Sequence, residues 1–194
     1  MAISSRIAKI ARTPGLQRVL AGIAITIASV GIVVAAGSGA GEYQTREAFL
    51  LESLGTPDAP SDVVWLNNEL RSKARAVLGH EPAMLRVRYW YAGDKTAWIL
   101  EEIGKEKPIT FGIVIANGSL QALRVLQFRE SRGWEIRHQF FTKQFANLHL
   151  NKKDKLDRRI DSISGATLSV QAATRVATLA LILDASKSKT DSTG

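Results

Sequence analysis

The longest uncharged stretch of this chain lies close to its start and constrains its fold most strongly. Residues 19–41, VLAGIAITIASVGIVVAAGSGAG, contain no Asp, Glu, Lys or Arg. The most apolar part, residues 19–36, would form a helix of about 27 Å, close to the roughly 30 Å hydrocarbon core of a bilayer. A soluble core helix of this length normally carries a polar stripe, whereas this part has only Thr26 and Ser29. We therefore predict a transmembrane anchor over residues 19–41.

A cleaved signal peptide is the main alternative to an anchor. Its apolar region is usually about 7–15 residues long, and residues 34–36 or 38–40 offer small side chains for cleavage. Residues 1–18 hold four basic residues and no acidic residue, which is half of the net charge of +8. Because a basic flank stays in the cytoplasm, we predict a single-pass protein of the bacterial cytoplasmic membrane, with the C-terminal domain on the periplasmic side.

The composition excludes most redox and metal centres. The chain has no cysteine, which rules out disulfides, thiolate catalysis, Cys-ligated zinc, iron–sulfur clusters and C-x-x-C-H haem attachment. Its three histidines, His80, His138 and His149, lie on separate segments, so we predict no metal site. The remaining charge is spread over the exported part, so we also expect no nucleic-acid partner.

Residues 42–185 are predicted to form one α+β domain, an antiparallel sheet packed by helices. Apolar spacing predicts helices over residues 42–54, 61–78, 142–148 and 168–183, the first two ending at Gly55 and Gly79. Alternating or continuous apolar runs predict strands over residues 84–91, 96–103, 109–116 and 119–128. Asn117-Gly118 joins the last two as a hairpin. One sheet face should lie on the helices and the other, with Arg86, Arg88 and Arg124, in water. We expect residues 186–194 to be disordered.

Five basic residues gather shortly before the last predicted helix. They are Lys152, Lys153, Lys155, Arg158 and Arg159, interrupted by Asp154 and Asp157. The simplest interpretation is a solvated surface loop, and the alternative is a patch that attracts phosphate.

The loop directly before that helix is Asp161-Ser162-Ile163-Ser164-Gly165-Ala166-Thr167. A helix start exposes unpaired N–H groups that attract phosphate, and Gly165 and Ala166 leave room for a close ligand. A hydroxyl of Ser164 or Thr167 that simply caps the helix is the alternative interpretation.

These seven residues resemble the Asp-x-x-Ser/Thr-Gly-Ala-Thr flavinylation motif of the FMN-binding domain family. Subunits of the sodium-translocating NADH:quinone reductase and of the Rnf complex belong to that family. The resemblance implies that FMN is attached through its phosphate to the Thr167 hydroxyl, with Ser164, Gly165, Ala166 and Leu168 as neighbouring cofactor contacts. It further implies that a flavin transferase recognises Asp161 and takes the FMN from FAD with a magnesium ion.

The resemblance extends upstream and covers about residues 109–183. Residues 112–128 resemble the family's hairpin, and Glu130-Ser131-Arg132-Gly133 resembles its Glu-Thr-Pro-Gly loop. Residues 141–145 take the place of its aromatic–Gln–Phe segment. The resemblance thus implies flavin contacts from Glu130, Ser131 and Gln144, and ring stacking by one of four aromatic residues: Trp90, Tyr91, Trp134 or Phe145. Departures at Ser131, Arg132 and Trp134 favour a stand-alone relative over an ordinary subunit of either complex.

The sequence contains no evident catalytic acid, base or substrate pocket, so we assign no catalytic residue. A threonine hydroxyl is a poor nucleophile without a base, which is why attachment needs a separate transferase. The expected function is electron transfer between a membrane redox partner and an extracytoplasmic acceptor. A flavin-bearing regulatory or assembly module is the alternative, followed by a flavin-dependent reductase with its own small substrate.

Overall fold

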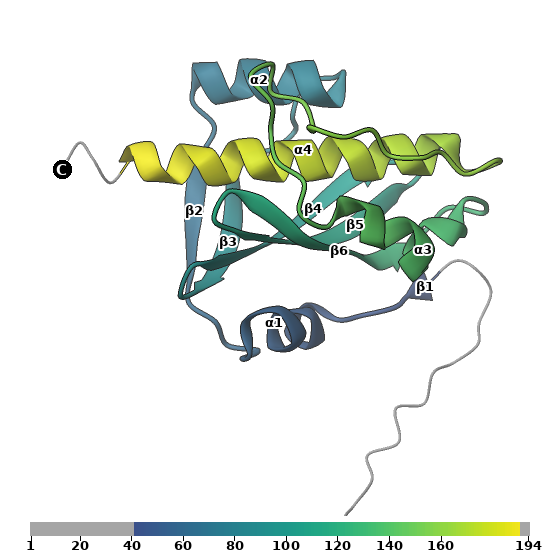
Figure 1. The fold of residues 1–194 in the computed structure, drawn as a ribbon, viewed down its shortest axis with the longest axis horizontal. Coiled ribbons are helices and arrows are strands. Elements are labelled where there is room, and N and C mark those ends of the chain that lie inside the picture. Colours follow the sequence, from purple (N-terminus) through teal and green to yellow (C-terminus); the bar gives the residue numbers. More distant parts are fainter. Residues whose placement is uncertain (1–40, 191–194) are drawn as a thin grey trace, which may run out of the picture. The chain divides into compact units, whose positions relative to one another are not determined.

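A six-stranded antiparallel sheet forms the framework of the domain, with strand order β1-β6-β5-β4-β3-β2 (Figure 1). The computed structural model describes residues 41–190, with the side chains of residues 41–187. The strands are β1 Gly41–Glu42, β2 Ser61–Trp65, β3 Arg86–Ala92, β4 Lys95–Ile103, β5 Pro108–Ala116 and β6 Ser119–Phe128. The helices are α1 Arg46–Leu54, α2 Asn68–Leu78, α3 Gln139–Thr142 and α4 Thr167–Thr190, with 3-10 turns η1 Trp134–Arg137 and η2 Lys143–Phe145.

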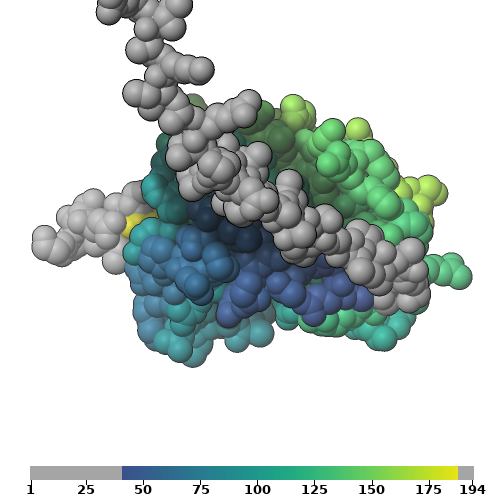
Figure 2. Space-filling view, turned by 90° about the horizontal axis from the view of Figure 1, so that it is seen from below, coloured from purple at the N-terminus to yellow at the C-terminus, as the bar shows by residue number. Residues whose placement is uncertain are grey.

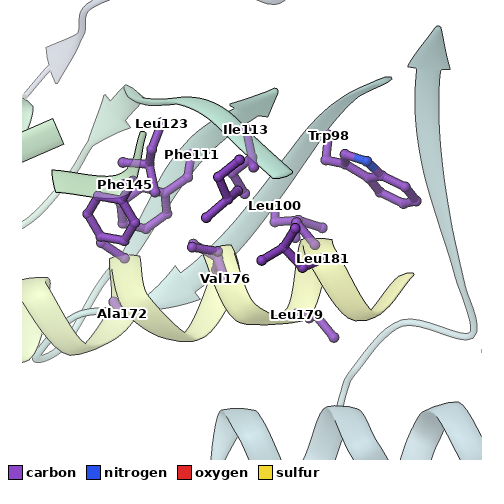
Figure 3. Close-up of a cluster of buried hydrophobic side chains, with 14 of the residues drawn as sticks. Trp98, Leu100, Phe111, Ile113, Leu123, Phe145, Ala172, Val176, Leu179 and Leu181 are labelled. Carbon is purple, nitrogen blue, oxygen red and sulfur yellow. The ribbon is translucent and has the colours of Figure 1, made fainter. Parts of the chain in front are cut away.

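The long helix α4 packs along one face of the sheet and forms the main core with it. Figure 3 shows Phe111, Ile113 and Leu123 of the strands directed at the helix that carries Ala172 and Val176. The apolar spacing that predicts this helix is confirmed, since the residues that make up its apolar face are buried: Ala172, Ala173, Val176, Leu179, Ala180 and Leu183. Helix α2 covers the outer side of α4 (Figure 1), and Thr178 on that side is only 6% exposed.

Helix α1 covers part of the opposite face of the sheet, on the side from which Figure 2 is seen. Phe49 and Leu50 are buried there against residues of three central strands. Gly112 makes this contact possible, because a Cβ at that position would lie 2.6 Å from the Phe49 ring. The prediction that this face is open to water is therefore wrong in part. Arg124 pairs with Glu52 of α1 at 2.9 Å, whereas Arg86 and Arg88 are exposed.

The first two predicted helices begin later than expected. Residues 41–42 pair with β6, and α1 starts after Thr45, whose side chain accepts a hydrogen bond from the Ala48 N–H. Residues 61–65 form a strand on β3 instead of a first helical turn, because consecutive β-branched and aromatic side chains favour a strand. Helix α2 starts after Asn67, which caps the Leu70 N–H. The predicted ends are confirmed, since Gly55 and Gly79 both have a φ of 81°.

The short helix expected over residues 142–148 is displaced towards the N-terminus, as α3 and η2 over residues 139–145. The last helix is longer than predicted. It extends to Thr190, so the expectation of disorder is wrong for residues 186–190. The described residues do not include residues 191–194 or the predicted basic segment. They also do not include the predicted anchor, apart from Gly41 in β1.

Within residues 41–190, α4 is the single helix with the length and apolar composition needed to cross a membrane. Since 67% of its apolar window is buried inside the fold, we assign it as the core helix of this domain.

Candidate functional site

The loop Asp161–Thr167 makes a tight turn that ends at the first residue of α4. Gly165 has a φ of +80°, which side chains other than glycine rarely adopt. The next residue, Ala166, is 2% exposed, and its N–H donates to the Ile163 carbonyl at 3.0 Å. Thr167 and Leu168 follow as exposed residues. The buried alanine therefore fixes the turn to the core, while the threonine stays accessible at the helix start.

A cleft of about 730 Å³ runs beside α4 from Thr167 to Thr178. Its other walls are α2 and the segment of residues 153–162. The volume falls in the range of about 300–1,000 Å³ that small-molecule sites occupy. Ser162 and Thr167 of the predicted motif both line this cleft.

The lining of the cleft is strongly cationic around an apolar base. The basic lining residues are Lys73, Lys153, Lys155, Arg158, Arg159 and Arg175. Asp154, the acidic lining residue, pairs with Lys73 at 3.1 Å and so ties the segment to α2. The apolar lining residues are Ala76, Val77, Leu156, Ile160 and Val170. Such a site suits an anionic ligand that also has an apolar part.

The basic stretch therefore has a definite position in the structure. Four of its five residues line the cleft together with Thr167, while Lys152 does not. Asn151 orders the stretch, because its side chain accepts hydrogen bonds from the N–H groups of Lys153 and Lys155 at 2.9 and 3.3 Å. These four residues are exposed as well, but their arrangement around Thr167 favours the phosphate-attracting patch over a loop that is merely solvated.

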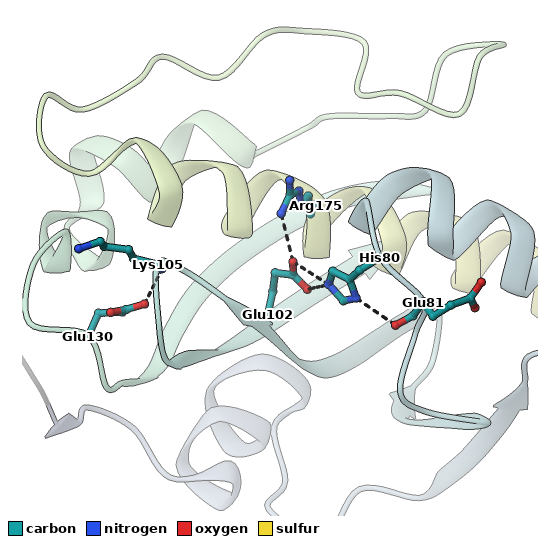
Figure 4. Close-up of polar contacts among 6 residues, drawn as sticks. All are labelled: His80, Glu81, Glu102, Lys105, Glu130 and Arg175. Carbon is teal, nitrogen blue, oxygen red and sulfur yellow. Dashed lines mark hydrogen bonds and ion pairs between the residues drawn. The ribbon is translucent and has the colours of Figure 1, made fainter.

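Glu130 lies at a buried turn away from the cleft lining. Its Oε1 accepts hydrogen bonds from the backbone N–H groups of the β4–β5 turn, at 2.5, 2.6 and 2.9 Å from Lys105, Glu106 and Lys107. Burial raises the pKa of this carboxyl, but the three N–H groups outweigh it, so that the pKa is lowered overall. Figure 4 shows Glu130 directed at this turn. In this structure the residue holds a hairpin together.

The loop of residues 130–133 nevertheless lies against the flavinylation motif. A Cβ at Gly133 would be 2.5 Å from the Ser169 Oγ and 3.5 Å from the Ala166 Cα, so only glycine allows this approach. Ser131 and Arg132 in the same loop are exposed. The two segments that carry the family resemblance therefore meet at the first turn of α4.

Gln144 fixes the start of the motif. Its Oε1 accepts a hydrogen bond from the Asp161 N–H at 2.7 Å. Arg158 reaches the same region, where its guanidinium donates to the Gln144 and Ala146 carbonyls at 3.3 Å. Asp161 itself is exposed. Gln144 thus positions the loop that precedes Thr167.

The four aromatic candidates for ring stacking lie elsewhere in the described part of the chain, since none of them lines the cleft. Phe145 is fully buried and packs edge-on against Phe141 at 5.4 Å. Trp90 packs near α1, and Tyr91 is 40% exposed on β3. Trp134 lies in η1, which contacts α4.

Sequence reasoning did not identify Arg175 and Lys73 as part of this site. In the sequence, Arg175 lies on the polar side of the last helix with Gln171, Thr174 and Thr178. This spacing is the available signal, but the residues that face Arg175 were not predictable. Glu102, which is 4% exposed, pairs with Arg175 at 3.3 Å and with the His80 Nε2 at 3.2 Å (Figure 4). The Glu81 carbonyl and the Glu102 carboxylate raise the pKa of His80. This cluster joins the end of α2 to β4 and α4.

Within residues 41–190, no group of three or more His, Asp or Glu side chains is placed to hold a metal ion. Comparison with known families shows that residues 104–182 match the FMN-binding domain. The match runs from the end of β4 through the motif and most of α4. A search of curated proteins returned no match.

Proposed function

Because residues 104–182 match the FMN-binding domain, we propose that this chain is a membrane-anchored flavoprotein with FMN bound covalently to Thr167. In this proposal it passes electrons between a membrane redox partner and an extracytoplasmic acceptor. The observation that carries the proposal is the position of Thr167, exposed at the start of α4 on the rim of a cationic cleft.

The chemistry of the cleft fits FMN. An FMN phosphate esterified to Thr167 keeps one negative charge, which the unpaired N–H groups at a helix start stabilise. The basic side chains that line the cleft add longer-range attraction. The apolar base beside Val170 and Ile160 offers a surface for an uncharged ring. The flavin supplies the redox chemistry, and the chain supplies its position and electrostatic surroundings.

Attachment requires a second protein in this proposal. Thr167 lacks the adjacent base that activates a hydroxyl, since Asp154, the acidic residue of the described cleft lining, pairs with Lys73. A flavin transferase would join the Thr167 Oγ1 to the phosphorus of the FMN half of FAD. AMP leaves as the pyrophosphate bond breaks, and the hydroxyl proton is released. A magnesium ion would neutralise the pyrophosphate, and the exposed Asp161 is available to the transferase.

Covalent attachment has a physical use on the periplasmic side of a membrane. A flavin that dissociates there is lost, because FMN is made in the cytoplasm. An electron carrier needs a permanently bound cofactor but no catalytic acid or base for a substrate. The charged groups that line the cleft fit this role, because they are mainly cations rather than an acid–base pair.

Co-expression with a flavin transferase tests the attachment. After denaturing electrophoresis, the wild-type band should show flavin fluorescence and Thr167→Ala should show none. Thr174→Ala is the matched control, since Thr174 lines the same cleft about two helical turns further along α4, and it should keep the fluorescence. Fluorescence that persists in Thr167→Ala would contradict the proposal.

Electron transfer is tested separately in membranes that contain the flavinylated chain. Reduction and reoxidation of the flavin by the quinone pool or by cytochromes, at rates comparable with respiration, is the expected result. A bound flavin that none of these partners reduces or oxidises would instead favour the regulatory or assembly module. Steady turnover of a small acceptor by the isolated protein would favour the reductase.

A further inference from the structure

One end of the domain carries a chain of aromatic and cationic groups in contact with one another. The Arg137 guanidinium lies 4.6 Å from the centre of the Tyr43 ring and 4.9 Å from that of Trp134. The Trp134 ring is 5.4 Å from His138, which is 6.0 Å from Phe140. We call these five residues the aromatic–arginine cluster. Phe140 is 63% exposed, so the cluster ends in a large apolar side chain at the surface.

The cluster lies where the chain enters the fold. Gly41 already pairs with Phe128 of β6, and the Tyr43 N–H donates to the Leu126 carbonyl at 2.8 Å. In the sequence, only residues 37–40 separate the most apolar part of the uncharged run, residues 19–36, from Gly41, the first paired residue of the sheet. Figure 1 shows β1 and α3 at the same end of the sheet. Five residue steps from 36 to 41 span at most about 18 Å, so an anchor over residues 19–36 would keep this end of the domain near the membrane surface.

We propose that the aromatic–arginine cluster rests on the phospholipid surface of the membrane. The inference rests on the membrane anchor of the proposed function, but not on the flavin. Tryptophan and tyrosine are enriched at membrane–water interfaces, and an arginine can pack its stem on apolar groups while its charge stays at the headgroups. Arg132 and Lys143, which flank the cluster in sequence, are exposed and add attraction to anionic headgroups.

The same contact would hold the start of α4 close to the bilayer. Turn η1, which carries Trp134 and Arg137, contacts α4, and Gly133 directly before it packs on Ala166 and Ser169. The residue that carries the flavin in our proposal would thus lie at the membrane-facing end. A redox partner embedded in the membrane would then approach Thr167 without a rearrangement of the domain.

Exposed apolar residues at the opposite edge of the sheet provide a control. Leu85 is 66% exposed and lies beside β2, where its carbonyl accepts a hydrogen bond from the Leu66 N–H. Strand β2 and strand β1 are the two outer strands of the sheet. Leu85 and Phe140 therefore have similar exposure but lie at different edges.

The absence of cysteine makes a clean experiment possible. Phe140→Cys and Leu85→Cys are each labelled with bimane in the full chain, without flavin, and reconstituted into vesicles of neutral and anionic phospholipids. A fraction of the lipids carries a nitroxide quencher at the headgroup. We expect quenching at position 140 to exceed that at position 85 severalfold. Equal quenching at the two positions, or stronger quenching at position 85, would overturn the proposal.

Two further readouts separate this proposal from the flavin assignment. Flotation of the vesicles reports membrane insertion, and a chain that does not float with them removes both the anchor and the proposed contact. In-gel flavin fluorescence of the same variants after co-expression reports attachment independently of lipid quenching. Strong quenching at position 140 in a chain that accepts no flavin would uphold the membrane contact and contradict only the flavin assignment. Thermal unfolding of the labelled chains, unchanged from wild type, confirms that both report on the native fold.

Discussion

At the residue scale, Gly165 shapes the site through its backbone conformation, and Glu130 stabilises a hairpin away from the cleft. Gly165 takes a positive φ directly before the buried Ala166, and this turn ends at Thr167. Glu130 accepts three backbone N–H groups at a turn that is distant in sequence. The position of Gly165 was predictable from the sequence, because this residue belongs to the motif of residues 161–167. The role of Glu130 was not predictable, because its partners are the N–H groups of the β4–β5 turn, which lie close to Glu130 only in the folded sheet.

Replacement of Gly165 by alanine should destabilise the domain and impair flavin attachment. The left-handed conformation costs an L-residue about 1–2 kcal/mol, although nothing obstructs a Cβ there. We expect a free energy of unfolding lower by about 1 kcal/mol, together with slower flavin loading. Gly41→Ala is the control, since its Cβ also meets nothing and no positive φ is required. Chemical denaturation measures the change, and equal stability of the two variants would contradict this reading.

The Glu130 carboxylate should make the stability of the domain depend on acid pH. Its pKa is lower in the folded protein than its ordinary value, so its contribution is fully present above the ordinary pKa of about 4.5 and is lost as pH falls through the folded value. Glu130→Gln should cost about 1–2 kcal/mol at pH 7 and flatten the acid side of the stability curve. Denaturation between pH 7 and pH 3 measures both effects. A wild-type and a variant curve that run parallel would contradict them.

At the scale of elements, the strands and the last helix were largely predictable. Residues 109–116 and 119–128 are long apolar runs around Asn117-Gly118, and their strands and hairpin are confirmed. Residues 61–65 were misread because their apolar spacing also fits a helix, while the pairing with β3 that decides the matter is not local. The cleft was not predictable for the same reason, since α2 and residues 153–162 meet only through contacts such as Lys73 with Asp154.

The cleft cations should speed flavin loading. Lys155→Gln with Arg159→Gln removes two lining charges, so we expect severalfold slower attachment at limiting FAD, and a smaller difference at high salt because screening weakens the attraction. Lys152→Gln removes a charge from the same segment outside the cleft lining and serves as the control. In-gel fluorescence over a time course gives the rates. Equal slowing by the control variant would indicate a general charge effect rather than a site.

The His80–Glu102–Arg175 cluster should stabilise the junction of α2, β4 and α4 most strongly in acid. The pKa of His80 is raised in the folded protein, so its contribution is fully present below its ordinary value of about 6.5 and is lost as pH rises through the folded value. The imidazole is half exposed, which limits the effect to less than about 1 kcal/mol. His80→Gln should abolish this part of the pH dependence between pH 5 and pH 8. Thermal unfolding across that range measures it, and an unchanged profile would contradict the assignment.

At the scale of the whole molecule, the chain combines three features: an uncharged run that ends at residue 41, a domain whose sheet begins at the same residue, and a threonine at the start of its core helix. The composition predicts the anchor, which lies outside the described residues and stays a prediction, and a chain without cysteine cannot form thiol-based centres. The proposed contact with the lipid surface was not predictable from the sequence, because it rests on a cluster assembled from two distant segments, at Tyr43 and at residues 134–140.

The central claim is that Thr167 carries FMN, and peptide mapping tests it most directly. Trypsin should release residues 160–175 of the flavinylated chain as one peptide, which contains Ser162, Ser164, Thr167, Ser169 and Thr174 as possible attachment sites. The account predicts that this peptide gains the mass of FMN less one water, and that fragment ions assign the gain to Thr167. An unmodified peptide, or FMN on another of its hydroxyls, would contradict the account.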